Sequence, residues 1–260
     1  MDSITNSNRD FDRHSKLTDY TMLKYLDSLA TNEDNNIQKR LLTELVHKYV
    51  SLENRVDALL KNTLPAEIAE EIKYEGKFAP RAYECTILFS DFAGFTLLAE
   101  KIHGKVLIEL LDYIFKGFDD IAAGFKGTKV KTIGDAYMAV FGAPAEYDDH
   151  AVMAVDAGLA LFDFMDSFNK REGHNFQMRV GIHTGKVIAG VVGKHRMQFD
   201  VFGDNVNIAS RFESSGEKGK VNVSHETYMR TQSKFTFEER GGISLKNKAA
   251  MKAYFVKGRI

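Results

Sequence analysis

The sequence predicts an α+β fold in which helices cover one face of a mostly antiparallel sheet, preceded by a separate helical region at the N-terminus. The first observation is that short apolar runs rich in β-branched residues alternate with amphipathic segments from Tyr83 onward. The second is a heptad pattern of apolar residues near the N-terminus. The third is a short segment with glycine and proline, 76–80, which separates the two patterns. We therefore divide the chain into an N-terminal region 1–61, a connector 62–80 and a main domain 81–260.

The charge balance and the cysteine content narrow the class of protein. Lys and Arg total 35 and Asp and Glu total 36, so the formal net charge is −1, whereas a general nucleic-acid-binding protein usually has a basic excess. We therefore expect no nucleic-acid partner. Cys85 is the one cysteine, which excludes an intramolecular disulfide. No apolar run reaches the roughly 18 residues of a membrane-spanning helix, and the first residues lack a signal-peptide pattern, so we expect a reducing, cytoplasmic setting without a direct membrane span.

Apolar residues of the N-terminal region follow helical spacings. Spacings of mostly three between Leu17 and Leu29 predict an amphipathic helix over 16–30, and the polar segment 31–36 predicts a break that caps the next helix. In that next helix, residues seven apart form the a and d positions of about three heptads, a pattern typical of a short coiled coil. The a positions are Leu42, Tyr49 and Val56, and the d positions are Leu45, Leu52 and Leu59. The alternative is an amphipathic helix that lies on its own domain.

Helices and strands alternate in the rest of the predicted structure. Helices are expected around Ile68 in the connector and then over about 94–103, 105–124, 147–170 and 204–214. Single strands are expected over about 83–90, 128–133, 136–142, 196–202 and 252–257. Two hairpins complete the set: one from Gln177–His183 to Lys186–Val192 that turns at Thr184-Gly185, and one over 235–246.

Two aspartates end apolar runs and lie beside glycine-containing turns. Asp91 follows a predicted strand, and Asp135 sits in the turn between the strands 128–133 and 136–142. Hard divalent cations prefer carboxylate oxygens, and phosphate groups prefer oriented backbone N–H donors. Strand ends hold such groups rigidly. The two aspartates therefore indicate a site where a pair of metal ions meets a triphosphate.

Four motifs, in order along the chain, carry a resemblance to a known family. They are LFSDFAGFT at 88–96, KTIGDAYMAV at 131–140, RVGIHTG at 179–185 and FDVFGDNVNIASR at 199–211. On these motifs, residues 80–257 resemble the catalytic domain of the class III nucleotidyl cyclases, which make cyclic AMP or cyclic GMP. The resemblance implies a ferredoxin-like sandwich, in which helices pack on an antiparallel-rich sheet. Residues 62–80 resemble the connector that often precedes such domains.

The resemblance also implies a role for each matching residue. Asp91, Asp135 and the Phe92 carbonyl would bind two Mg²⁺ or Mn²⁺ ions, one to activate the ribose 3′-hydroxyl and one to clamp the phosphates. Asn207 would orient the ribose, and Arg211 would stabilise charge that develops on the α-phosphate. Backbone N–H groups at a helix start would hold phosphate oxygens. These groups belong to Phe92, Ala93, Gly94, Phe95 and Thr96.

Three lysines and an aspartate complete the implied substrate contacts. Lys246 matches the phosphate-binding lysine of the family, although the glycines that usually flank it are replaced, and Lys248 is the alternative. Lys131 would donate to adenine N1, and Asp200 would accept from the exocyclic amine. The guanylate-forming relatives have glutamate and cysteine at these two positions. The resemblance therefore implies an adenylate cyclase, with ATP as substrate and cyclic AMP and pyrophosphate as products.

The family places its active site between two catalytic domains, one of which supplies metal ligands and the other base and ribose contacts. This chain holds both sets, which implies a symmetric homodimer with two equivalent sites. A parallel coiled coil at 42–60 would raise the effective concentration of the two domains, and it makes residues 1–60 a candidate regulatory transducer that a partner could act on. Two other interpretations are a degenerate cyclase domain without turnover and a coiled-coil interaction module whose main task is regulation.

Overall fold

The computed structural model describes residues 33–260 apart from 96–98, 101, 194–195 and 244–248. The chain divides into two compact units after Thr63. The helix predicted over 16–30 lies outside the described residues. The candidate phosphate-binding residues Thr96, Lys246 and Lys248 also lie outside them.

A long helix, α2 (Glu33–Lys61), is the described element of the first unit. It contains all six predicted heptad positions. Each of these side chains is exposed, from 39% at Leu42 to 66% at Leu45 and Tyr49. The helix is therefore confirmed, whereas its pairing with a second copy stays a prediction.

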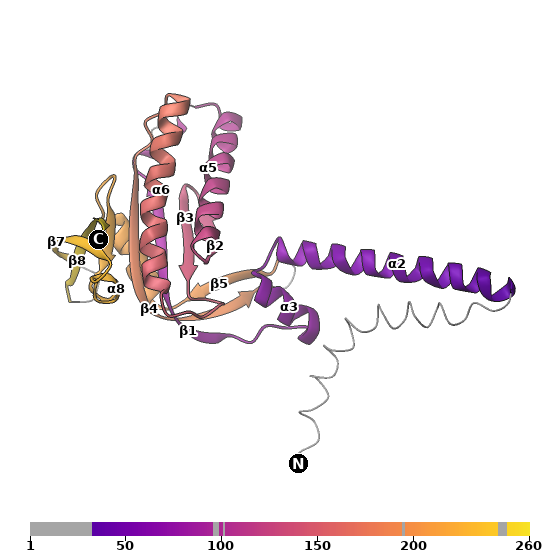
Figure 1. Ribbon diagram of the computed structural model, residues 1–260. Coiled ribbons are helices and arrows are strands. Elements are labelled where there is room, and N and C mark those ends of the chain that lie inside the picture. Colours follow the sequence, from indigo (N-terminus) through magenta and orange to yellow (C-terminus); the bar gives the residue numbers. More distant parts are fainter. Residues whose placement is uncertain (1–32, 96–98, 101, 194–195, 244–248) are drawn as a thin grey trace, which may run out of the picture. The chain divides into compact units, whose positions relative to one another are not determined.

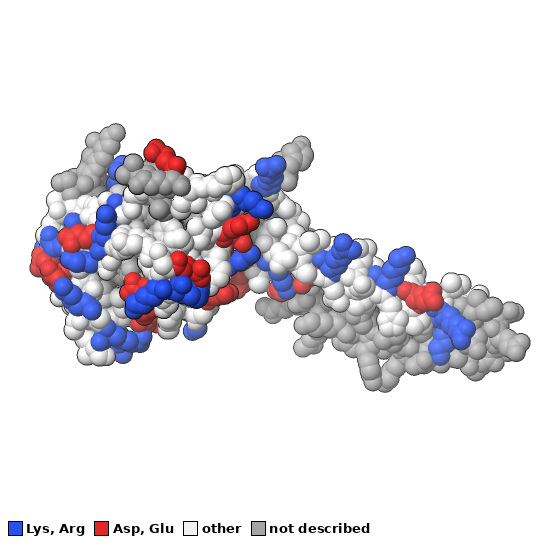
Figure 2. Space-filling model, turned by 90° about the horizontal axis from the view of Figure 1, so that it is seen from above, with Lys and Arg blue, Asp and Glu red and all other residues white. Residues whose placement is uncertain are grey.

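Charges of both signs are mixed on the face of the molecule that Figure 2 shows. On the face seen in Figure 2, Lys and Arg side chains alternate with Asp and Glu side chains. Among the helices that the structure describes, none combines the length and the apolar character that crossing a membrane requires.

The second unit is built on one eight-stranded sheet (Figure 1). A short helix, α3 (Ala66–Glu75), precedes the sheet. In pairing order, the main path is β2 (Gly127–Ile133), β3 (Ala136–Phe141), β1 (Arg81–Phe92), β4 (Met178–Val192), β6 (Val221–Ser224), β8 (Met251–Arg259) and β7 (Phe235–Ile243). Off this path, β5 (Gln198–Phe202) pairs with β4. Among the described strand pairs only β4 and β6 run parallel, so the sheet is antiparallel-rich as predicted.

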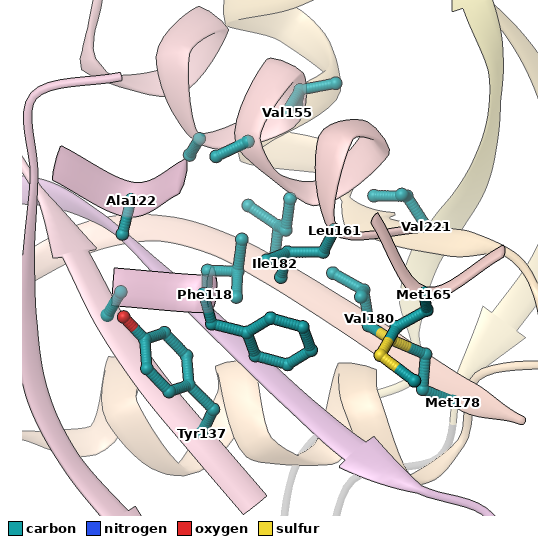
Figure 3. Close-up of a cluster of buried hydrophobic side chains, with 14 of the residues drawn as sticks. Phe118, Ala122, Tyr137, Val155, Leu161, Met165, Met178, Val180, Ile182 and Val221 are labelled. Atoms are coloured by element: carbon teal, nitrogen blue, oxygen red, sulfur yellow. The ribbon is translucent and has the colours of Figure 1, made fainter. Parts of the chain in front are cut away.

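Two helices, α5 (Gly104–Gly124) and α6 (His150–Glu172), lie side by side on one face of the sheet (Figure 1). Their apolar sides form the main hydrophobic core with the sheet (Figure 3). There Phe118 of α5 and Leu161 and Met165 of α6 meet Val180 and Ile182 of β4. Four residues of the helix predicted over 94–103, namely 96–98 and 101, are not described, and among the other six Phe95 and Ala99 are helical.

The helix α7 (Asp204–Ser214) lies on the opposite face, so the prediction that the helices share one face is wrong. Side chains of successive strand residues point to opposite faces. On β4, Ile182 contacts the position of Gly158 in α6, whereas Gly181 faces the backbone of Glu213 in α7. The sequence pattern shows which side of a helix is apolar, but it does not show which face of the sheet receives that side.

The strand β4 runs unbroken from residue 178 to residue 192, so the hairpin predicted at Thr184-Gly185 is also wrong. All 12 residues of β1 pair with it. Gly185 is required by packing, because a Cβ there would lie 2.5 Å from Cγ of Asn205. This glycine marks the close approach of α7 to the strand and not a turn.

The second predicted hairpin, over 235–246, fails for a related reason. Residues 235–243 form the single strand β7, which pairs with β8. The ladder shifts register between Glu239 and Gly241, and Gly241 has a φ of 87°. Gly241 therefore marks a bulge within a strand. A short helix, α8 (His225–Thr231), connects β6 to this part of the sheet.

Gly181→Ala is expected to destabilise the second unit, because the added Cβ would lie 1.9 Å from the backbone nitrogen of Glu213 and α7 would have to move. Overpacking of this kind costs roughly 1–3 kcal/mol. Gly258→Ala is the matched control, since this glycine also lies in a strand and its added Cβ would meet nothing within 4 Å. Urea unfolding measures both variants. Equal midpoints for the two would contradict the packing of α7 against Gly181.

Candidate active site

Asp91 lies at the end of β1, on the side of the sheet that α7 covers. Its neighbour Phe92 points the other way into the core, where its ring centroid lies 6.4 Å from that of Phe118. The strand is paired with β3 on one side and with β4 on the other. The backbone that carries Asp91 is therefore held rigidly, as a metal ligand requires.

The second carboxylate, Asp135, lies against Asp91. It sits in the turn between β2 and β3, beside Gly134 with a φ of 64°. Burial raises the pKa of Asp135 to about 6, helped by a hydrogen bond to Asp91 and by the charge of Asp91. Backbone N–H groups of Asp135 and Phe92 oppose this rise. The fold thus brings together two carboxylates that are far apart in the sequence.

These carboxylates form a donor set that suits a hard divalent cation. The donors are oxygen atoms, and a positive ion beside them would relieve the repulsion that helps to raise the pKa of Asp135. Within the described residues, no group of three or more His, Cys, Asp and Glu side chains is arranged to hold a metal. An ion bound here would therefore complete its coordination with backbone, substrate or water oxygens.

The end of β1 and the turn after it carry the backbone N–H groups predicted to bind phosphate, and among the described ones Phe92 and Ala93 have partners. Ala93 donates to the Gln177 carbonyl at 2.7 Å. The N–H of Phe92 reaches the carboxyl group of Asp135. Gly94, which is exposed and has a φ of 78°, continues the turn toward Phe95.

Lys131 and Asp200, the predicted base-recognition residues, form an ion pair. Nζ of Lys131 lies 2.5 Å from Oδ2 of Asp200, and the two side chains are 29% and 15% exposed. Lys131 follows a register shift in β2, and Asp200 lies on β5. The other carboxylate oxygen of Asp200 accepts from the N–H of Val201 at 2.9 Å. A positive donor and a negative acceptor are therefore held side by side before any base is bound.

Asn207 and Arg211 lie one turn apart on α7 and share its exposed side. Ile208 and Phe212 occupy the side of the helix that faces the sheet, where they are 6% and 0% exposed. The two candidate catalytic side chains are therefore exposed at the surface of the chain that carries them.

Two charged residues that the sequence analysis did not assign link this helix to the carboxylate pair. Arg179, opposite Asp91 in the ladder, places Nη2 3.3 Å from Oδ2 of Asp91 and donates through Nε to Glu213 of α7 at 2.9 Å. Burial raises the pKa of Glu213, and Arg179 opposes that rise. Arg179 begins the RVGIHTG motif, but its role depends on the strand register and on the face that α7 covers.

Arg179→Met is expected to destabilise the second unit, because it leaves the carboxylate of Glu213 buried without its partner. Such losses reach about 3–5 kcal/mol, and we expect less because the arginine side chain is 25% exposed. The double variant Arg179→Met/Glu213→Leu should recover most of the loss. Urea unfolding of the unmodified chain, the two single variants and the double variant gives the coupling energy between the two side chains. Additive effects of the two substitutions would contradict the pairing.

Comparison with known proteins agrees with this fold and these motifs. Residues 78–258 match the family model of the adenylate and guanylate cyclase catalytic domain. A receptor-type guanylate cyclase of Caenorhabditis elegans is 34% identical over 98% of this chain and 20% of its own length. An adenylate cyclase of Mycobacterium tuberculosis is 38% identical over 79% of this chain and 47% of its own length.

A solved structure is similar as well. It is the catalytic core of a rhodopsin-guanylyl cyclase with converted specificity, in complex with ATPαS. It shares 35% sequence identity at a TM-score of 0.67 and covers 69% of this chain and 98% of its own. This likeness confirms the predicted fold class. The chain spans less than half the length of the two curated relatives. Its motifs, its sheet and these matches together show that the chain belongs to the class III nucleotidyl cyclases, with a catalytic domain at residues 78–258.

Proposed function

We propose that this chain is an adenylate cyclase, which converts ATP to 3′,5′-cyclic AMP and pyrophosphate. The observation that supports this choice of nucleotide is the ion pair of Lys131 and Asp200. Lys131 donates to N1 of adenine, and Asp200 accepts from the exocyclic amine. Guanine presents an N1–H and a carbonyl at that edge, so that Lys131 would face a second donor. Leaving these polar groups unpaired costs on the order of 1–3 kcal/mol.

The carboxylate pair and the turn after β1 are assigned to the metal ions and the phosphates. Asp91, Asp135 and the Phe92 carbonyl would hold two Mg²⁺ or Mn²⁺ ions. When bound, these ions supply a lowered pKa of the ribose 3′-hydroxyl and a counter-charge for the phosphates. The N–H groups of Gly94, Phe95 and Thr96 are assigned to phosphate oxygens, together with those of Phe92 and Ala93, which would exchange their present partners for phosphate.

The remaining assigned residues act on the reacting centre. Asn207 orients the ribose, and Arg211 donates to the α-phosphate oxygens as negative charge develops there. Lys246, or Lys248 in its place, adds positive charge beside the phosphates. The 3′-oxygen forms a bond to the α-phosphorus, the bond from that phosphorus to the leaving pyrophosphate oxygen breaks, and the hydroxyl proton passes to water.

We infer that the active unit is a homodimer with its sites between the chains. Each chain carries the carboxylate pair, the base-recognition pair and an α7 whose Asn207 and Arg211 are exposed. The exposed heptad stripe of α2 supports a parallel coiled coil. Lys48 falls at a g position and Glu53 at the next e position, so a parallel pair brings Lys48 against Glu53 of the partner subunit. A regulatory partner would act through this helix.

A guanylate cyclase is the second candidate, because the receptor-type guanylate cyclase matches 98% of this chain. A domain without turnover is less well supported, since the carboxylate pair and the base-recognition pair are both intact.

We place the enzyme in the reducing cytoplasm. There the single thiol of Cys85 stays reduced, and its burial raises its pKa to about 12.

The first test measures cyclic AMP and cyclic GMP made by the purified chain from ATP and from GTP. Each nucleotide is supplied with Mg²⁺ or Mn²⁺ over a range of protein concentrations. We expect cyclic AMP, with a specific activity that rises with protein concentration. Cyclic GMP as the main product would favour the second candidate, and no product from either nucleotide would favour the domain without turnover.

The double variant Lys131→Glu/Asp200→Cys is expected to shift preference toward GTP, because each position then presents the opposite hydrogen-bonding character. The ratio of kcat/KM for ATP to that for GTP measures the shift. Lys129→Glu is the matched control, since Lys129 lies on the same strand but pairs with Asp119 at 2.8 Å. The assignment of the base site fails if the double variant keeps the ATP selectivity of the unmodified chain.

Leu45→Glu/Leu52→Glu places charges in the heptad stripe and is expected to shift the chain toward monomer. Activity should fall at low protein concentration and recover at high concentration. His47→Glu/Asn54→Glu adds the same residues at exposed f positions and should change neither property. Sedimentation and activity are measured on the same samples. Unchanged association in the leucine variant would remove the support for the coiled coil.

A further inference from the structure

A line of buried polar side chains runs through the catalytic unit from α6 to α7. Successive members lie 2.8–3.3 Å apart. In order, they are His150, Thr86, Thr184, Thr227, Ser224, His183 and Asn205. The first six members are at most 5% exposed. Because buried polar groups without partners are costly, the hydrogens along this line have to be arranged so that each group is satisfied.

The end at α7 fixes the direction of donation. Nδ2 of Asn205 donates to the Lys186 carbonyl at 2.8 Å, which leaves Oδ1 facing Nε2 of His183 at 2.9 Å. An amide oxygen only accepts, so Nε2 of His183 carries a hydrogen. In the neutral ring, Nδ1 then accepts from the Ser224 hydroxyl at 2.8 Å.

Hydrogen-bond donation runs in the same direction along the whole line, toward α7, because each hydroxyl has a single hydrogen to donate. Ser224 donates to His183, and each threonine donates to the member nearer α7. Thr86, the farthest of them, accepts from Nδ1 of His150 at 2.8 Å. All members are satisfied when His183 carries its hydrogen on Nε2 and His150 carries a hydrogen on Nδ1.

His183 touches α7 on both sides of the candidate catalytic residues. Nε2 binds Asn205 in the first turn, and the ring lies parallel to that of Phe212, with an interplanar angle of 11° and centroids 6.1 Å apart. Asn205 in turn fills the space that a side chain on Gly185 would need. The segment between these contacts carries Asn207 and Arg211, which therefore take their position from the seating of α7 on β4.

We propose that His183 is a positioning residue for the cyclase reaction. Through Asn205 and Phe212 it sets the depth and rotation of α7, while the hydroxyl line from His150 satisfies its other ring nitrogen. This inference rests on the proposed function, from which Asn207 and Arg211 take their roles. Those roles concern the reacting ribose and the developing charge, so misplacement of α7 lowers kcat and changes KM little.

The matched variants His183→Met and His183→Gln test the positioning role. The two new side chains are similar in length, but glutamine keeps an N–H that can donate to Asn205. We expect kcat of the methionine variant to fall about 10- to 100-fold, as a displacement near 1 Å does, and glutamine to restore part of the loss. A methionine variant with the kcat of the unmodified chain would overturn the proposal.

Thr231→Val is the control for a purely structural effect. Thr231 is fully buried and is not a member of the line; its hydroxyl donates to the backbone carbonyl of Thr227, whose own hydroxyl belongs to the line. Its loss should lower the midpoint of urea unfolding without lowering kcat. A fall in kcat as large as that of His183→Met would show that general loosening, and not the seating of α7, explains the effect.

¹⁵N NMR of the histidine rings tests the line in the unmodified full chain, without turnover. We expect hydrogen on Nε2 of His183 and on Nδ1 of His150. Hydrogen on Nδ1 alone in His183, or on Nε2 alone in His150, would overturn the line. If neither nucleotide is turned over, the proposed function fails. Hydrogen exchange of the α7 amides then decides the positioning role, with faster exchange expected for methionine than for glutamine at position 183.

Discussion

The pairing of β1 with β4 is the constraint on which the rest of the catalytic unit depends. One continuous antiparallel register places Asp91 opposite Arg179 and Ile87 opposite His183. The same register sends alternate side chains to the main core under α5 and α6 and to the side that α7 covers. A slip of one residue would exchange these two sets. The hydrophobic core, the carboxylate pair and the seating of α7 are therefore compatible in this register alone.

Local signals were sufficient for the parts of the site that depend on sequence neighbours. Asp91 and Asp135 end apolar runs beside glycines, and the structure places both where strands end or turn. The resemblance identified Lys131 and Asp200, which the structure joins in an ion pair. Contacts between elements that lie far apart in the sequence could not be predicted from local patterns. A Thr-Gly pair has the local character of a turn, and only the partner strand shows that β4 continues through Thr184 and Gly185.

Arg179 and the face that receives α7 were missed for the same physical reason. An arginine at the start of a strand is ordinarily solvated. Its role as a partner of buried carboxylates becomes visible only when the structure places a carboxylate across the ladder and a helix over the arginine.

The site also combines two opposed electrostatic effects. Burial, and after it the neighbouring Asp91, raises the pKa of Asp135, while Arg179 holds positive charge between Asp91 and the buried Glu213. The proposed metal and phosphate site thus carries a cost that the surrounding core and ladder have to offset.

The unbroken course of β4 also limits how this sequence can change in length. Arg179, Gly181, His183 and Gly185 fall on alternate residues of one strand, so neighbouring groups are spaced by about 6.6–6.8 Å. A substitution alters one of these contacts at a time. An insertion or deletion of one residue between 179 and 185 turns every later member toward the opposite face. This segment therefore tolerates changes of side chain far better than changes of length, although it contains the residue pair that most resembles a loop.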